Sequence, residues 1–418
     1  MRDTEWSDQL SGRSPGAPLD VERFFKLDIL EPATPGHVEP LILEGDRDGE
    51  LWFVYSELYT DRSIHFKSSN DAGRTWQEQW RAKDAAGNDV VGFHITVLHL
   101  KSGGLGMVYT DIAKEYGHPG REEGSMVFFR VSNDRGHTWS DPVLMDTVHS
   151  CCCTGHAMVL SDGRLLAPVF RWISPQTGGE AENWNTEDGI PSPTFSYSYT
   201  CISDDEGKTW KRSLSELFTS VNRAAWDLEE PTVVELRDGR LLMHLRSGMG
   251  RMYKSYSSDE GLSWTRPGPV HIAAANAPAF LHRIPSTGNL LMVWNQASRQ
   301  EIVTNRCRIR LSSAISTDEG ETWENFKNLE ALDDVDIVTP PPASDAIACQ
   351  AYEIYGGLQP EPAERYHRAP GALRICYPTI AFAGDQAAIT YDLGGGICNG
   401  MGARLRVIPV EWFSEPSA

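Results

Sequence analysis

The chain has 418 residues, of which 40% are hydrophobic and 10% aromatic, enough to bury a sizeable core. Its formal net charge is −20 and it has no lysine- or arginine-rich run, which argues against nucleic acid and anionic membranes as partners. No run of 18 apolar residues occurs, so no membrane-spanning helix is predicted. The eight cysteines, three of them consecutive at 151–153, fit neither a disulfide framework nor a zinc site. We therefore expect a reduced, cytoplasmic protein that needs no metal or other cofactor.

The first segment, 1–20, is polar and has no apolar stretch typical of a signal peptide, so we predict an N-terminal tail. A strand-like stretch, Glu22–Ile29, follows it. Beyond this point, two apolar runs joined by a glycine-containing turn recur six times, and each pair is typical of a β-hairpin. The six hairpins are Leu41–Tyr55, Thr96–Tyr109, Met158–Phe170, Val233–Arg246, Ile284–Trp294 and Ile380–Tyr391.

A second repeat, the frame S-x-D-x-G-x-[ST]-W, follows each of the first five hairpins. In such a frame the aspartate accepts hydrogen bonds from turn amides, the glycine supplies a positive φ and the tryptophan packs between blades. Because an enzyme needs its chemistry only once, we interpret the five aspartates as architecture. The frames are Ser69–Trp76, Ser132–Trp139, Ser203–Trp210, Ser257–Trp264 and Ser316–Trp323.

The alternation of hairpin and frame predicts an all-β fold, a six-bladed β-propeller with five such repeats. The spacing of the frames fits one four-stranded blade per repeat. We expect one propeller domain over 21–418, closed by either Glu22–Ile29 or Arg404–Trp412. Two regions, 174–193 and 324–375, show no strand pattern, and the second is long enough to cover a site.

Polar residues gather where the predicted hairpins begin and end, away from their turns. In a propeller these positions lie near the axis at one mouth of the ring, which is the default place for a binding site. The strand openings carry His37, Glu39, His94, His156, Glu230 and Tyr377, and the exits carry Asp61, Asp111, Arg171 and Arg246.

The repeated frames on six blades resemble the sialidase superfamily, where the frame is called the Asp box. The resemblance implies an arginine triad that binds the substrate carboxylate, a tyrosine nucleophile paired with a glutamate, and an aspartate acid/base. The segment Glu230–Arg246 resembles the one that carries the glutamate and one triad arginine, and Cys376–Asp392 resembles the tyrosine segment. Arg308 resembles another triad arginine, with Arg310 nearly as good a match.

The chemistry of such a site explains these residue types. A keto-acid sugar has a carboxylate on its anomeric carbon, which repels a carboxylate nucleophile, whereas a neutral phenol avoids the repulsion. The phenol needs a neighbouring base because its ordinary pKa is about 10. From their positions on their strands we expect Tyr377 and Glu230 to meet across the axis, at about 2.6–3.2 Å or through one water.

The sequence also departs from the family pattern. Where the first triad arginine belongs, this chain has Val38, and where an aspartate-proline is usual in the second blade it has His94-Ile95. The family position of the acid/base falls near Ser63, and Asp61 is the closest carboxylate.

We therefore predict an exo-acting glycoside hydrolase of the sialidase type, which cleaves a terminal acidic sugar from an oligosaccharide or glycoside. Two alternatives remain open: a related propeller that uses histidine and carboxylate chemistry on another acidic sugar, as hydrolase or lyase, and a non-catalytic propeller that binds glycan or protein. The predicted catalytic residues are Tyr377, Glu230 and Asp61. The predicted substrate-binding residues are Arg246, Arg308, His37, Glu39, His94, His156, Arg171 and Asp111.

Overall fold

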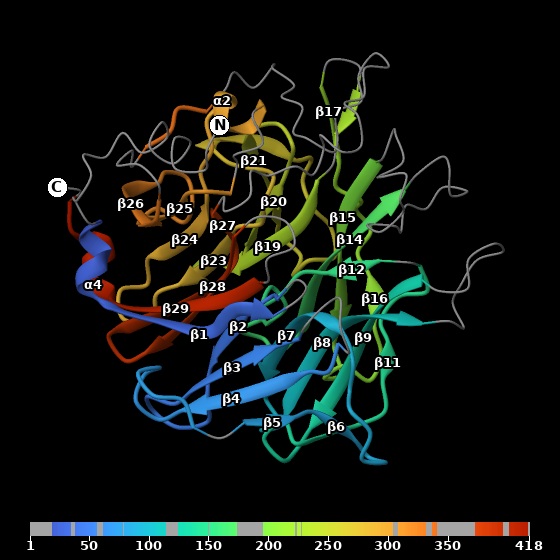
Figure 1. Ribbon diagram of the computed structural model, residues 1–418. Coiled ribbons are helices and arrows are strands. Elements are labelled where there is room, and N and C mark those ends of the chain that lie inside the picture. The colour runs from blue at the N-terminus through green and yellow to red at the C-terminus, as the bar shows by residue number, and fades with distance from the viewer. Residues whose placement is uncertain are drawn as a thin grey trace.

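The computed structural model describes residues 19–34, 38–56, 62–77, 79–113, 124–148, 150–173, 195–221, 224–226, 228–303, 308–331, 337–340, 373–395 and 401–416. Six antiparallel sheets follow one another along the chain and form the six blades of a β-propeller, which confirms the predicted fold (Figure 1). The described helices are the short η1 (Asp20–Arg23), α2 (Arg299–Val303) and α4 (Val410–Ser414). None of them is long and apolar enough to cross a membrane.

Each blade begins with its innermost strand and proceeds outward. Blade 1 consists of β2 (Leu41–Glu44), β3 (Leu51–Tyr55), β4 (His65–Ser69) and β5 (Gln79–Arg81). Blade 2 consists of β7 (Phe93–His99), β8 (Leu105–Ala113), β9 (Gly124–Ser132) and β11 (Val143–Leu144). In blade 3 the inner strand is split, so that the blade consists of β12 (Cys151–Cys152), β13 (Met158–Val159), β14 (Leu165–Ile173), β15 (Phe195–Ser203) and β16 (Lys211–Arg212).

The second half of the ring follows the same plan. Blade 4 consists of β19 (Glu229–Glu235), β20 (Leu241–Arg246), β21 (Arg251–Ser257) and β22 (Gly268–Ala273). Blade 5 consists of β23 (Phe280–Arg283), β24 (Leu290–Asn295), β25 (Leu311–Ser316) and β26 (Glu324–Glu330). Blade 6 consists of β27 (Leu373–Ala383), β28 (Gln386–Gly395), β29 (Met401–Pro409) and β1 (Phe25–Thr34). Two small pairs lie outside the blades: β6 (Lys83–Asp84) with β10 (Thr138–Trp139), and β17 (Thr219–Val221) with β18 (Ala224–Trp226).

Two details of the strand prediction were wrong. The region 324–375 was expected to contain no strand, but its first residues form β26, the outer strand of blade 5, and its last residues, 373–375, begin β27. The fifth hairpin was expected to begin at Ile284, but its first strand is β23, Phe280–Arg283, and Ile284 already closes the turn by a bond from its N–H to the carbonyl of Asn289. The outer strand is mostly polar, so the apolar pattern that marks inner strands is absent from it.

The five frames have the same hydrogen bonds, which explains why their residues recur. In Ser257–Trp264, for example, the Ser257 hydroxyl donates to Asp259 at 2.8 Å, and the amide of Gly261 donates to the Ser257 oxygen at 2.9 Å. The other frames repeat the serine–aspartate bond at the same 2.8 Å. The frame glycine also lies against the preceding blade: a Cβ at Gly207, whose φ is +86°, would come within 1.9 Å of the Phe129 ring. The aspartates therefore hold turns together.

The ring is closed by the two ends of the described chain. Strand β1 pairs antiparallel with β29, so the N-terminal strand becomes the outermost strand of the last blade (Figure 1). Of the two predicted closing segments, Glu22–Ile29 contributes the closing strand, while Arg404–Trp412 supplies the strand that receives it.

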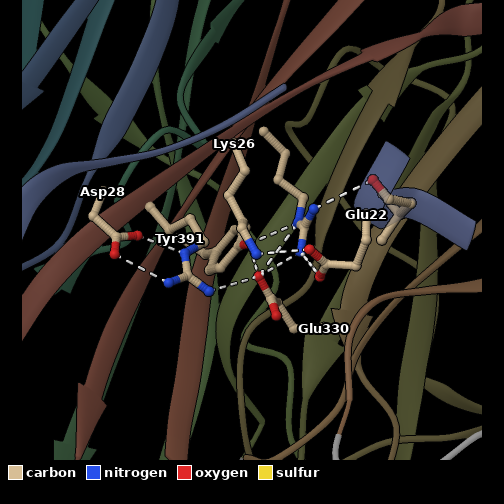
Figure 2. A network of polar contacts seen from close by, with 8 residues as sticks. Glu22, Lys26, Asp28, Glu330 and Tyr391 are labelled. Carbon is tan, nitrogen blue, oxygen red and sulfur yellow. Dashed lines mark hydrogen bonds and ion pairs between the residues drawn. The ribbon is translucent and has the colours of Figure 1, made fainter. Parts of the chain in front are cut away.

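A network of buried and partly buried polar side chains stabilises this closure, and Figure 2 shows its contacts. The carboxylate of Glu330 accepts hydrogen bonds from Tyr391 Oη at 2.5 Å, from Arg406 Nη2 at 2.9 Å and from Arg404 Nη1 at 3.1 Å. The same two arginines reach the N-terminal segment: Arg406 bonds to Glu22 at 2.6 Å and Arg404 bonds to Asp28 at 2.6 Å. The network thus connects blade 5, blade 6 and the first described residues.

Candidate active site

The innermost strands of blades 2, 4 and 6 share a local irregularity near the mouth of the ring. Each has a break in its pairing register, between Phe93 and Thr96, between Glu229 and Thr232, and between Cys376 and Thr379. Inside each break one side-chain-bearing residue has a positive φ: His94 at 52°, Glu230 at 43° and Tyr377 at 50°. Such conformations are costly for residues other than glycine and concentrate at functional sites.

In each irregular segment a threonine contacts the backbone of the next blade. Thr232 Oγ1 accepts a hydrogen bond from the amide of Leu281 at 3.2 Å, and Thr379 Oγ1 accepts one from the amide of Ile42 at 3.0 Å. Thr96 Oγ1 makes a longer contact, 3.5 Å, with the carbonyl of Cys153. The surrounding blades thus hold the strained residues in position.

Tyr377 and Glu230 meet across the axis. Tyr377 Oη donates a hydrogen bond to Glu230 Oε1 at 3.0 Å, within the range expected from the sequence. Both side chains are buried, since Tyr377 is 8% exposed and Glu230 only 1%. Arg246 donates from Nη1 to the other oxygen of Glu230. The pair is therefore a phenol and a carboxylate in direct contact, with a guanidinium behind the carboxylate.

Asn276 positions two arginines beside this pair. Arg246 Nε donates to Asn276 Oδ1 at 2.7 Å, and Arg308 Nη2 donates to the Asn276 carbonyl at 2.9 Å. The guanidinium carbon of Arg308 lies 5.7 Å from the centre of the Tyr377 ring. Arg310, the alternative match in the sequence, instead forms a buried ion pair with Glu301 at 3.0 Å. Arg308 is thus the arginine that faces the tyrosine.

Burial and charge set the protonation states of the pair. Burial works against the charge of Glu230, but the positive charge and hydrogen bond of Arg246 outweigh it and hold the pKa of Glu230 below its usual value. Burial raises the pKa of the Tyr377 phenol well above its usual value, and the neighbouring charge of Glu230 adds to this. In the free protein, therefore, the carboxylate is ionised and the phenol carries its proton.

A second carboxylate, Glu39, lies in the same region with His94 and Thr154. His94 Nδ1 is 2.5 Å from Glu39 Oε2, and the Thr154 hydroxyl donates to the same oxygen at 2.7 Å. Burial disfavours a charge on the His94 ring, but Glu39 outweighs this effect and raises the pKa of His94. Glu39 and His94 therefore form a buried ion pair.

His156 differs from His94 although both lie near the axis. It packs at 5.0 Å from the Phe280 ring, and burial lowers the pKa of His156 to about 3, so its ring is neutral. Two neighbouring cysteines are not reactive thiolates, since burial raises the pKa of Cys152 to about 12 and the pKa of Cys153 well above its usual value. Cys152 Sγ instead donates to the carbonyl of His94 at 2.8 Å.

Two other predicted site residues bond to side chains outside this pair. Asp111 forms an ion pair with Arg62 at 3.0 Å, and Arg171 Nη1 lies 3.4 Å from the hydroxyl of Tyr197. His37 and Asp61 lie outside the described residues.

Comparison with known proteins shows the family of this chain. The family of BNR repeat-like domains matches residues 112–387, which is more than half of the chain. The chain belongs to this BNR-repeat family. Together with its six blades, this makes it a divergent propeller of the sialidase superfamily. No curated protein matches the sequence.

Solved structures share the fold of this BNR-repeat propeller at low sequence identity. A protein of unknown function from Dyadobacter fermentans is 15% identical over 95% of this chain and 100% of its own, with a TM-score of 0.60. The Hadza microbial sialidase Hz136 is 16% identical over 90% of this chain and 66% of its own, with a TM-score of 0.58. Trypanosoma rangeli sialidase is 15% identical over 96% of this chain and 61% of its own, with a TM-score of 0.57. The BNR-repeat chain thus spans less than two thirds of the length of these two sialidases.

The sequence did not predict three residues of this BNR-repeat site, namely Asn276, Thr154 and Glu229. The carboxylate of Glu229 lies 3.4 Å from Arg246 Nη2. A signal for the shared irregularity was nevertheless present. The sequences Phe-His-Ile-Thr and Glu-Glu-Pro-Thr open the inner strands of blades 2 and 4, and Cys-Tyr-Pro-Thr lies near the start of the inner strand of blade 6, with the site residue always two before the threonine.

Proposed function

We propose that this protein is an exo-acting glycoside hydrolase that removes a terminal keto-acid sugar through Tyr377 and Glu230. The observation that carries the proposal is the hydrogen bond from Tyr377 Oη to Glu230 Oε1, inside a buried site that two arginines border. A structural tyrosine would not need a base of this kind, held at positive φ on the facing blade.

In this mechanism Tyr377 is the nucleophile and Glu230 its base. As the phenolic oxygen attacks the anomeric carbon, its proton passes to Glu230, so that no buried phenolate has to exist beforehand. The positive charge of Arg308 beside the ring stabilises negative charge that develops on the phenolic oxygen. Tyrosine nucleophiles are a known exception to the two-carboxylate scheme of glycosidases.

Arg246 and Arg308 bind the carboxylate of the sugar. In the free protein Arg246 is bonded to Glu230, which weakens Glu230 as a base. A substrate carboxylate that shares Arg246 withdraws part of this positive charge, and the pKa of Glu230 then rises as the substrate binds. Binding of an anionic sugar thus prepares the base for the proton from Tyr377.

The structural neighbours support this substrate class. Trypanosoma rangeli sialidase has been solved in complex with sialic acid and, with 2,3-difluorosialic acid, as a covalent intermediate. A second candidate, hydrolysis or elimination on a different acidic sugar, is favoured by one observation: the buried carboxylate of Glu39 lies 2.5 Å from Nδ1 of His94. It follows Val38, which stands where the family resemblance leads us to expect the first triad arginine. A lyase would release an unsaturated, ultraviolet-absorbing sugar, which a hydrolase does not.

The proposal is tested with aryl glycosides of sialic acid and of other keto-acid sugars, on the wild-type protein and on Arg246→Lys. Lysine keeps the charge but loses the planar fork that binds a carboxylate through two nitrogens. We expect KM to rise about 10- to 100-fold, which corresponds to one or two charge-assisted hydrogen bonds.

A matched control is Arg237→Lys, since Arg237 pairs with Glu319 near the hairpin turns at 3.0 Å, and its KM should not change. An unchanged KM in Arg246→Lys, or a wild-type protein that releases no phenol from any of these glycosides, would contradict the proposal.

A further inference from the structure

We infer that His94, held by Glu39 and Thr154, is the general acid that protonates the oxygen of the leaving group. This inference rests on the proposed function, because it supplies the proton donor for the bond that Tyr377 breaks. It assigns to His94 a role that differs from the aspartate acid/base expected from the family resemblance, for which Asp61 was the candidate.

The position of His94 supports this role. His94 occupies in blade 2 the same bulged position that Glu230 occupies in blade 4 and Tyr377 in blade 6, with the same positive φ. Because these blades alternate around the ring, their three side chains converge on the axis from three directions. The charges of Glu230 and Arg246 both act on His94, as expected for groups that lie close together. His94 is thus the third member of a set whose other two members are the proposed nucleophile and base.

The contacts of His94 also fix the orientation of its ring. Glu39 contacts Nδ1 of His94 at 2.5 Å, and Thr154 fixes the carboxylate by a hydrogen bond of 2.7 Å to the same oxygen. The thiol of Cys152 holds the backbone of His94 through its carbonyl. Within the described part of the chain, Nε2 of His94 makes no hydrogen bond, so this nitrogen remains for a substrate. A carboxylate that orients a histidine in this way is common in general acid–base catalysis.

His94 also carries the proton that the leaving group needs. An alcohol leaving group needs a proton as the glycosidic bond breaks, and an imidazolium titrates near neutral pH, where it can both hold and release one. The ion pair with Glu39 keeps this proton on His94, whereas the ring of His156 is neutral and lacks the acidic proton of an imidazolium.

The reaction has two halves, and two protons move in each. Tyr377 Oη forms a bond to the anomeric carbon while its proton goes to Glu230. The bond from that carbon to the leaving oxygen breaks, and the oxygen takes the Nε2 proton of His94. In the second half, neutral His94 accepts a proton from water, whose oxygen attacks the anomeric carbon. The bond to Tyr377 then breaks, and Glu230 returns the proton to the phenol.

The test uses His94→Gln with two glycosides of sialic acid that differ only in the leaving group. The methyl glycoside releases a poor leaving group that needs a proton, whereas the 4-nitrophenyl glycoside releases a stabilised phenolate that hardly needs one. We expect kcat/KM to fall about 100- to 10,000-fold with the methyl glycoside and less than about tenfold with the nitrophenyl glycoside. A residue that only binds the sugar would lower both values by the same factor.

Two further variants make the result unambiguous. Glu39→Gln keeps the shape of the pair but removes its charge, and it should show the same dependence on the leaving group at smaller size. His99→Gln, at the opposite and exposed end of the same strand, should leave both substrates unaffected. Thermal unfolding of each variant separates a loss of activity from a loss of fold.

Equal losses on the two glycosides in His94→Gln would overturn the inference, and so would a leaving-group dependence found in Asp61→Asn but not in His94→Gln. Failure of the proposed function has a different signature, which is turnover of the nitrophenyl glycoside that survives in Tyr377→Phe. If the wild-type protein turned over neither glycoside, the proposed function and this inference would both be contradicted.

Discussion

Tyr377→Phe is expected to lower kcat by about 1,000-fold or more, with the protein still folded. The substitution removes only the phenolic oxygen, which is the atom that the mechanism bonds to the sugar and that donates to Glu230 at 3.0 Å. The remaining activity would come from the arginines and from binding alone. The measurement is single-turnover and steady-state kinetics on an aryl glycoside of sialic acid.

A matched control lies on the neighbouring strand of the same blade. Tyr391 is also fully buried, and its hydroxyl donates to Glu330 at 2.5 Å in the closure network. Tyr391→Phe should therefore lower the melting temperature and leave kcat almost unchanged. If Tyr377→Phe kept more than about a tenth of the wild-type kcat, Tyr377 would not be the nucleophile.

Arg406→Met is expected to have the largest effect on stability, about 3–5 kcal/mol in the free energy of unfolding. Arg406 is completely buried and bonds to both Glu330 and Glu22. Its loss leaves the negative charge of Glu330 with less positive charge nearby, and it removes a bond that holds the N-terminal segment. The measurement is equilibrium unfolding in urea, compared by transition midpoint and slope.

Two comparisons check the physical reason. Lys26→Met breaks the partly exposed pair of Lys26 with Glu22, at 2.6 Å, and should cost less than about 1 kcal/mol. Adding Glu330→Gln to Arg406→Met should recover part of the stability, because it removes the charge that lost a partner. A cost in Arg406→Met no larger than that in Lys26→Met would show that the network does not hold the ring closed.

The inner part of the fold could be predicted from the sequence because buried hairpins leave a strong pattern. In blade 1, for example, all five residues of β3 are buried, and its turn carries a glycine at φ +75°. The outer strands could not be predicted in the same way. Strand β26 is mostly polar. The stretch Glu22–Ile29 was predicted to be a strand, but no local pattern records its pairing with β29, in which Phe25 lies opposite Val407, so Arg404–Trp412 stayed an alternative for closing the ring.

In the site, too, some features could be predicted from the sequence and others could not. Glu230 and Tyr377 could be predicted because their strands and turns fix their height and face, and their contact is present in the structure. The positive φ that both adopt could not be derived from apolar spacing. The bond between Thr154 and Glu39 joins residues 115 positions apart, and Asn276 reaches Arg246 from the connection between blades 4 and 5. Such contacts depend on how the blades pack and not on any one segment.

The central claim, that Tyr377 becomes bonded to the sugar, can be tested by trapping the intermediate. 2,3-Difluorosialic acid has a fluoride that can leave from the anomeric carbon, and a second fluorine slows the hydrolysis that follows. After incubation with this compound, mass spectrometry of the intact protein and of its peptides should show one added sugar, bonded to Tyr377, and none in Tyr377→Phe. A protein that gains no sugar, or that gains it on a different residue such as Glu39, would contradict the account.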